Sequence, residues 1–158
     1  MPGPNATNTY IGSFHFKVTI QGVNDPLDGF TACSGIKSST EPMEFKHGMD
    51  MVVRKAPGRT VYEPCTIERV YAGYDDFTRW RDSIIAGNID RRTVSIEYLR
   101  PDQSLVTRFD LLGAWISRWE SPDLNAMGSD GAMEKIELTY ETVIQARGCA
   151  LRAAVSRR

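Results

Sequence analysis

The sequence predicts a mainly β domain of the α+β class, in which two antiparallel sheets pack into a small barrel or sandwich with one flanking helix. Two observations indicate this fold. About seven strand-like segments follow one another at short intervals, and only one segment has the apolar period of an α-helix. Since helices do not alternate with the strands, the pattern argues against a doubly wound α/β domain. The 158 residues suffice for one domain with a substantial core.

Three segments in the first part of the chain resemble strands. Residues 14–21 alternate strictly between apolar and polar side chains, which is typical of a half-buried strand. Residues 30–34 form a shorter candidate that ends before Gly35. Residues 36–45 are polar on both faces and contain Pro42. We therefore expect this third segment at a sheet edge or a bulge, with neither face in a dry core.

A basic segment, residues 51–66, is the most unusual part of the chain. Strand-like residues flank Pro57 and Gly58, which predict a tight turn, because Pro57 pre-sets φ and Gly58 accepts the positive φ of a type II turn. The segment has no evident hydrophobic face, and a two-stranded ribbon is marginal alone in water. We therefore expect an extended arm, residues 47–65, that lies on its own domain or on another molecule. The basic residues near its turn are Arg54, Lys55 and Arg59.

One helix is expected in the second half of the chain. Asp75 can cap its N-terminus, Phe77, Trp80 and Ile84 fall on one face, and Gly87 stands where the helix should stop. The remaining strands are expected at residues 65–71, 93–100, 105–112, 114–120 and 132–145, with a short hairpin turn at 101–104.

The charge distribution separates the body of the chain from its end. The formal net charge is -1, from 19 basic and 20 acidic residues. Residues 147–158 contain four Arg and no acid, so 15 basic residues remain before them and the body carries -5. This composition argues against a nucleic-acid-binding domain. We expect a flexible arm at residues 1–9, a domain at 10–146 and a basic tail at 147–158.

The start of the chain lacks the features of a secretory signal, and no apolar run is long enough to span a bilayer. We therefore expect a protein without a membrane anchor that is made in the cytoplasm.

Residues with catalytic or metal-binding chemistry are sparse. His47 lies near Glu44 and Asp50, but no zinc-binding or protease motif surrounds it, and Ser34 lacks the glycine frame of a nucleophile elbow. Three widely spaced cysteines indicate neither a disulfide framework nor a zinc site, and we expect them to be small, buried or neutral residues. The sequence thus predicts no enzyme, no metal and no cofactor.

Two tryptophans are candidates for an interface. Trp115 and Trp119 stand four residues apart in a predicted strand, so they should point to one face. That face could be part of the core or an apolar interface patch, and the sequence favours neither reading.

The order of several short motifs resembles that of the tail tube proteins of contractile phages and extracellular contractile injection systems. The resemblance covers about residues 10–141, and each motif alone is weak. The matching residues are Phe30, Ser34, Gly35, Glu41, Glu44, Gly48, residues 53–58, Tyr62, Glu63, Pro64, Arg69, Trp80, Arg91, Arg92, Ala114, Trp115, Trp119, residues 122–126 and Glu134. The chain departs from the family pattern at Val70, Gly113 and Ile116, and it continues past Gln145.

This resemblance implies a structural subunit of an inner tube. Six copies would close into a ring, and rings would stack into a hollow conduit for DNA or protein cargo inside a contractile sheath that joins a baseplate. The protein would then belong to an assembled, virion-like particle, which in the injection systems is released from the cell. Because of the departures, a minor subunit that initiates the tube on the baseplate is an alternative.

The arm would bridge copies in such a tube. Its contact residues would be Arg54, Lys55, Pro57, Gly58, Arg59 and Tyr62, and the acids that they would meet on another copy are Glu41, Glu44, Asp123 and Asp130. A more distant alternative is a monomeric ligand-binding β-barrel, although the sequence offers no cluster of polar residues to line its pocket.

Overall fold

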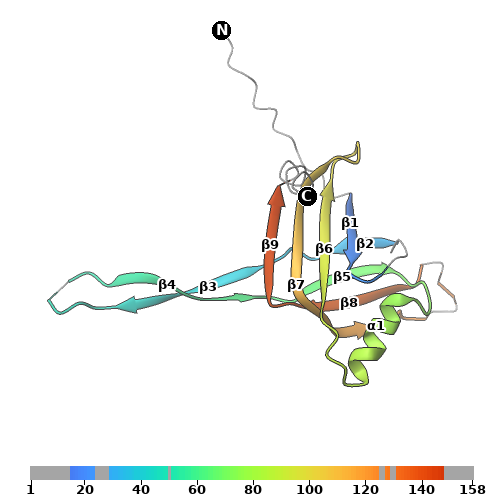
Figure 1. Ribbon diagram of the computed structural model, residues 1–158. Coiled ribbons are helices and arrows are strands. Elements are labelled where there is room, and N and C mark those ends of the chain that lie inside the picture. Colours follow the sequence, from blue (N-terminus) through green and yellow to red (C-terminus); the bar gives the residue numbers. More distant parts are fainter. Residues whose placement is uncertain (1–14, 24–28, 50, 125–126, 129–130, 148–158) are drawn as a thin grey trace, which may run out of the picture.

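The computed structural model of the chain describes residues 15–23, 29–49, 51–124, 127–128 and 131–147 (Figure 1). Nine strands and one helix occur in these residues. They are β1 (Phe16–Ile20), β2 (Phe30–Cys33), β3 (Ser38–Phe45), β4 (Arg54–Tyr62), β5 (Cys65–Val70), α1 (Asp76–Ile85), β6 (Arg92–Leu99), β7 (Leu105–Glu120), β8 (Met133–Thr139) and β9 (Thr142–Arg147).

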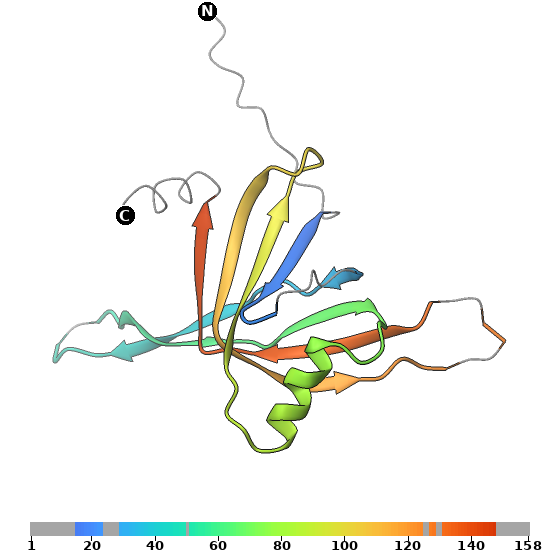
Figure 2. The same ribbon diagram turned by 45° about the vertical axis from the view of Figure 1, so that its right-hand side comes forward.

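The body of the molecule consists of two antiparallel sheets that share the long strand β7. One sheet contains β1, β6, β7 and β9, and the other contains β7, β8, β5 and β2. Figure 2 shows the first sheet upright, with β8 and β5 crossing below it. The path of paired strands runs β1-β6-β7-β8-β5-β2, and no pairing in the described part of the chain joins β1 to β2. The predicted pair of packed sheets is confirmed, whereas a closed barrel is not formed.

The shared strand β7 corrects the expectation of separate strands at 105–112 and 114–120. The chain continues through Gly113, which has φ +64° and bends the strand from one sheet into the other. A Cβ at Gly113 would lie 3.1 Å from the side chain of Glu141, so the position favours glycine for space as well as for φ. Conversely, the single strand expected at 132–145 is two strands, because the chain leaves β8 and enters β9 in the other sheet.

The core lies between the two sheets and beneath α1. Val18 and Ile20 of β1 are buried, while Lys17 and Thr19 are exposed. This burial confirms the predicted alternation over residues 16–20. Phe14 lies outside the described residues. The buried apolar residues of this core are Val18, Ile20, Cys65, Ile67, Phe77, Trp80, Val94, Ile96, Leu111, Ala114, Ile116, Ile136, Leu138 and Tyr140.

Helix α1 forms where the sequence predicts it, for local reasons. The Asp75 side chain accepts a hydrogen bond from the Thr78 backbone N–H at 3.1 Å, which caps the N-terminus. Phe77 and Trp80 are buried, and the chain leaves the helix at Gly87, whose φ is +91°. The helix therefore closes one end of the core with its predicted apolar face.

A buried ionic network joins the helix to the sheet. The guanidinium of Arg69, on β5, donates to Glu134 on β8 and, at 2.7 Å, to Asp75 at the helix cap. Burial alone raises the pKa of Asp75, but the hydrogen bonds from Arg69 and Thr78 outweigh it and lower that pKa below its usual value. The charge on Asp75 thus contributes to folding.

The arm is a separate two-stranded sheet that projects from the body (Figure 1). Its strands are β3 and β4, and every residue of β3 is exposed. The turn between them falls between Phe45 and Arg54, not at Pro57 and Gly58, so the predicted turn position is wrong.

Pro57 and Gly58 mark a bulge in the arm. Pro57 lies within β4 opposite Pro42, and the register shifts between Thr40 and Pro42. A Cβ on Gly58 would approach the backbone oxygen of Glu41 to 2.6 Å, so the glycine serves close packing at the bulge. The expectation that residues 36–45 lie at an edge or bulge is confirmed.

Candidate assembly surfaces

The arm has two different faces. On one face Met43 and Phe45 of β3 lie opposite Ala56 and Arg54 of β4. Met43 is 58% exposed and Phe45 is 50% exposed, so this face is apolar and open. The other face is polar, and there the Lys55 Nζ lies 3.3 Å from Glu44 Oε1 in a cross-strand pair. The sequence expectation of a ribbon without a hydrophobic face is therefore wrong, because the partner strand supplies that face.

The tip of the arm is also apolar. Met49, Met51 and Val52 are strongly exposed, and Val53 is exposed to a smaller extent. Together with Met43 and Phe45 they make six exposed apolar residues in this part of the arm, and we call these six residues the arm surface. Exposed apolar side chains gathered in one segment are typical of a surface that contacts another macromolecule.

The basic residues proposed for the arm do not act as one group. Alternation along β4 places Arg54 on the face of Phe45 and Lys55 on the opposite face. Arg59 lies at the bulge between Pro57 and Thr60, where the extra residue interrupts this alternation. Tyr62 lies at the root of the arm rather than on its free part. Its ring is half-buried, packs against the core and lies 5.9 Å from the ring of Tyr140. Tyr62 thus anchors the arm to the body.

The acids expected to receive the arm are also dispersed. Glu41 is exposed at the bulge, and Glu44 already pairs with Lys55 of its own hairpin. Asp123 is exposed in the segment 121–124, which follows β7 on the side of the body away from the arm (Figure 2). Asp130 lies outside the described residues.

The two tryptophans point to opposite faces, which corrects the prediction of a common face. The register between β7 and β8 shifts between Ile116 and Arg118, and the extra residue, Ser117, reverses the alternation. Trp119 packs against the core, where its Nε1–H donates to Glu134 Oε2 at 2.8 Å and the guanidinium of Arg81 lies 4.1 Å from its ring centre. Trp115 is on the outer face and partly exposed.

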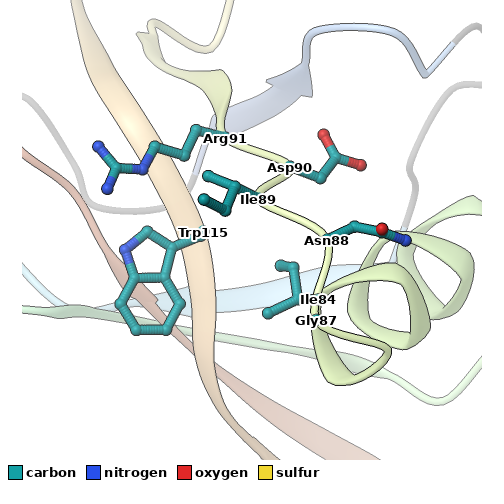
Figure 3. A pocket seen from close by; sticks show the side chains of 7 residues that line it. All are labelled: Ile84, Gly87, Asn88, Ile89, Asp90, Arg91 and Trp115. Atoms are coloured by element: carbon teal, nitrogen blue, oxygen red, sulfur yellow. The ribbon is translucent and has the colours of Figure 1, made fainter.

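Trp115 lines a shallow cavity of about 290 Å³ beside the end of α1 (Figure 3). The cavity has an apolar wall, and the adjacent Ile85 and the lining Ile89 are largely exposed. The Trp80 Nε1–H donates to the backbone oxygen of Asp90 at 2.9 Å, which fixes the loop after the helix. The lining residues are Ile84, Gly87, Asn88, Ile89, Asp90, Arg91 and Trp115.

The described residues hold no group of three or more side chains suited to bind a metal ion. His15 and His47 are exposed, and Ser34 bonds through its hydroxyl to the backbone N–H of Thr66 at 2.8 Å. No described helix is long and apolar enough to cross a membrane.

The model of the T4-like virus tail tube protein gp19 family matches residues 12–144. This match spans most of the chain and includes the arm. The chain belongs to this family. It is therefore a tail tube protein, a structural subunit of a tube. Comparison of the sequence with curated proteins gives no significant match.

Solved structures share the fold of this tail tube protein. A chain in the sheath/tube terminator of PVC, an extracellular contractile injection system, is 21% identical, with a TM-score of 0.77 over 89% of this chain and 99% of that chain. A chain in the cap of the anti-feeding prophage is 19% identical, with a TM-score of 0.74 over 87% and 91%. Hcp1 from Flavobacterium johnsoniae is 12% identical, with a TM-score of 0.53 over 85% and 96%.

Sequence reasoning missed the apolar part of the arm surface in this tail tube protein. The signal was present, because Met43 and Phe45 are two residues apart and so share a face of any strand. The polar residues around them, together with Pro42, made the segment look polar on both faces, so this short alternation was not recognised. Met51 likewise belongs to a segment that the sequence predicts as a strand, whereas it lies at the exposed tip.

Proposed function

We propose that this tail tube protein assembles into homohexameric rings that stack into a hollow tube. A contractile sheath would surround the tube, and a baseplate would hold its first ring. The observation that carries the proposal is the arm, which presents an apolar face away from the body in a member of this family. The similar chains occur in particles described as a baseplate, a sheath-tube complex and a tube-terminating cap.

The arm requires a partner for energetic reasons. Its strands pair with each other and not with a strand of the body, and a two-stranded sheet is marginal by itself in water. Covering Met43 and Phe45 removes apolar surface from water and holds the hairpin in one conformation. A second copy of the chain is the partner in our proposal, because a tube repeats one contact many times.

The contact between copies is head-to-tail. The arm leaves one side of the body, while the segment 121–124 that carries Asp123 lies on the other (Figure 2). A heterologous contact of this kind closes into a ring when the rotation that relates neighbouring copies is a whole fraction of 360°. Arg54 shares the apolar face, so it is the basic residue placed to meet acids such as Glu41, Asp123 or Asp130 of the next copy. Such pairs would set register more than affinity.

The remaining parts of the proposal concern the particle. The tube would conduct DNA or protein cargo and would perform no catalysis of its own. The protein would be made in the cytoplasm and would reach its site of action as part of the assembled particle. The outer-face cavity near Trp115 is a second surface available to neighbours in such an assembly.

Negative-stain microscopy and sedimentation velocity on the purified chain test this function. We expect six-fold rings of constant diameter and stacks of them at higher protein concentration. A compact monomer that persists at high concentration, with no ring or tube on the grid, would contradict the proposal and would favour a monomeric binding domain.

A further inference from the structure

Two cysteines that are distant in the sequence lie side by side at the root of the arm. Cys33 ends β2 and Cys65 begins β5, 32 positions later, and their Sγ atoms are 3.6 Å apart. In the antiparallel pairing of these strands Cys33 is opposite Ile67, so Cys65 is its diagonal neighbour on the same face. Both cysteines are free thiols.

The position of this pair relative to the arm is specific. The chain leaves the body after Cys33, forms β3 and β4, and returns to the body at Cys65 (Figure 1). A bond between the two sulfur atoms would therefore close a loop that contains the whole arm. It would fix the two points at which the arm joins the sheet.

The environment of the thiols suits sulfur exchange. The hydrogen bond between them raises the pKa of Cys33 and lowers the pKa of Cys65, because it favours the neutral form of the first and the charged form of the second. Cys65 is fully buried, whereas Cys33 is partly exposed and lies on an edge strand of four residues. An external reagent can thus reach Cys33, and Cys65 lies directly behind it, within reach of a mixed disulfide on Cys33.

We propose that Cys33 and Cys65 are a disulfide site, closed by a low-molecular-weight disulfide, which clamps the root of the arm. The Cys33 thiolate attacks one sulfur of the reagent, forms a mixed disulfide and releases one thiolate. The Cys65 thiolate then attacks the Cys33 sulfur and releases the second thiolate. The two cysteine protons end on the two leaving thiols, so the cysteines are oxidised as the reagent is reduced. This site goes beyond the proposed function and does not depend on it.

Closing the bond needs a small local movement. The sulfur atoms must approach from 3.6 Å to about 2.05 Å. Strand β2 can supply this movement, because it pairs only with β5 in the described sheet and already carries a register shift between Phe30 and Ala32. Since the bond closes a loop in the unfolded chain, the oxidised protein should unfold at a higher temperature than the reduced one.

The test uses the full chain with Cys149→Ser, which leaves only the proposed pair. The reduced protein is incubated with glutathione disulfide and denatured, and its free thiols and intact mass are measured. We expect the thiols to fall from two per chain to none, with a mass lower by two hydrogen atoms and no glutathione adduct. A rise in unfolding temperature that dithiothreitol reverses is expected as well.

Two single-thiol proteins serve as controls. Cys33→Ser and Cys65→Ser, each combined with Cys149→Ser, should show no loss of two hydrogens and no reversible rise in unfolding temperature. Two thiols that remain titratable in the Cys149→Ser protein, a stable glutathione adduct, or covalent dimers on a non-reducing gel would overturn the proposal. Because the decisive measurement uses the protein with both cysteines, it does not depend on how the control variants fold.

Discussion

Removing the apolar face of the arm should stop assembly without unfolding the protein. We choose the double variant Met43→Thr and Phe45→Thr, because threonine favours strands and keeps the hairpin. Phe45 is 50% exposed, and an aromatic side chain has roughly 200 Å² of surface, so docking can remove about 100 Å² of apolar surface from water. At about 25 cal/mol per Å² this burial is worth ~2–3 kcal/mol, or about 100-fold in the affinity of each contact.

This change should leave the stability of the body unaltered. Both side chains lie on a sheet that is separate from the core, and substitutions at such exposed positions usually alter unfolding free energy by about 0.5 kcal/mol or less. Sedimentation velocity reports assembly, and thermal unfolding followed by circular dichroism reports the body. We expect the concentration at which rings form to rise by about 100-fold or more, with an unchanged unfolding midpoint.

Lys55→Thr is the matched control. The Lys55 side chain is 64% exposed on the same arm, but it lies opposite Glu44 and so on the face opposite to Phe45. This variant should form rings at nearly the wild-type concentration. Rings of the double variant at the wild-type concentration would contradict docking through the apolar face. Equal losses in the double variant and the control would show that the arm is covered on both faces.

Four further predictions follow from particular contacts. Arg54→Glu with Arg59→Glu should abolish tubes and leave a folded protein, and unchanged tubes by negative stain would contradict this. Gly58→Ala should disturb the arm at its bulge, because the added Cβ meets the Glu41 backbone oxygen at 2.6 Å; ring formation should suffer while the unfolding midpoint of the body stays the same. Asp75→Ala should cost at least ~1 kcal/mol of unfolding free energy at pH 7. Since the folded pKa of Asp75 is depressed, its contribution is present above the unfolded value near 3.8 and is lost as pH falls through the folded pKa. In denaturant titrations, wild type and variant should therefore converge once the pH lies below that folded pKa. Tyr140→Phe should leave stability equal or raise it by ~1 kcal/mol, because the Tyr140 hydroxyl is buried without a hydrogen-bond partner in the described part of the chain; a clear loss would reveal a partner.

Local rules explain which elements the sequence predicts well. The helix is marked by Asp75 at its cap, by Phe77 and Trp80 on one face and by Gly87 after its end, and all of these act within a few residues. The hairpin of β6 and β7 likewise depends on one short turn. These signals need no knowledge of the rest of the fold.

Bulges explain most of the errors. Pro57 and Gly58 have the composition of a turn, but β3 pairs alongside them and makes them part of a strand. Gly113 reads as a break, yet it bends β7 from one sheet into the other. The extra residue Ser117 reverses the alternation and separates Trp115 from Trp119. Each of these outcomes depends on a partner strand that is far away in the sequence.

For the candidate surfaces, too, the sequence could predict local properties but not the pairing of distant strands. The sequence identified the arm and its basic residues as unusual, because charge and turn composition are local properties. It could not show that Met43 and Phe45 share an open face, since that follows from the pairing of β3 with β4. Nor could it bring Cys33 next to Cys65, which depends on the pairing of β2 with β5.

A photo-cross-linking amino acid at position 45 can show directly whether the arm docks on a neighbouring copy. The probe replaces Phe45 on the arm surface, and assembled tubes are irradiated and analysed by mass spectrometry. We expect covalent products between two chains, with the second chain modified on its body. Few such products should form in unassembled protein or from a probe at position 55, on the opposite face of the arm. Tubes that yield no products between chains from position 45 would contradict the docking of the arm on a neighbouring copy.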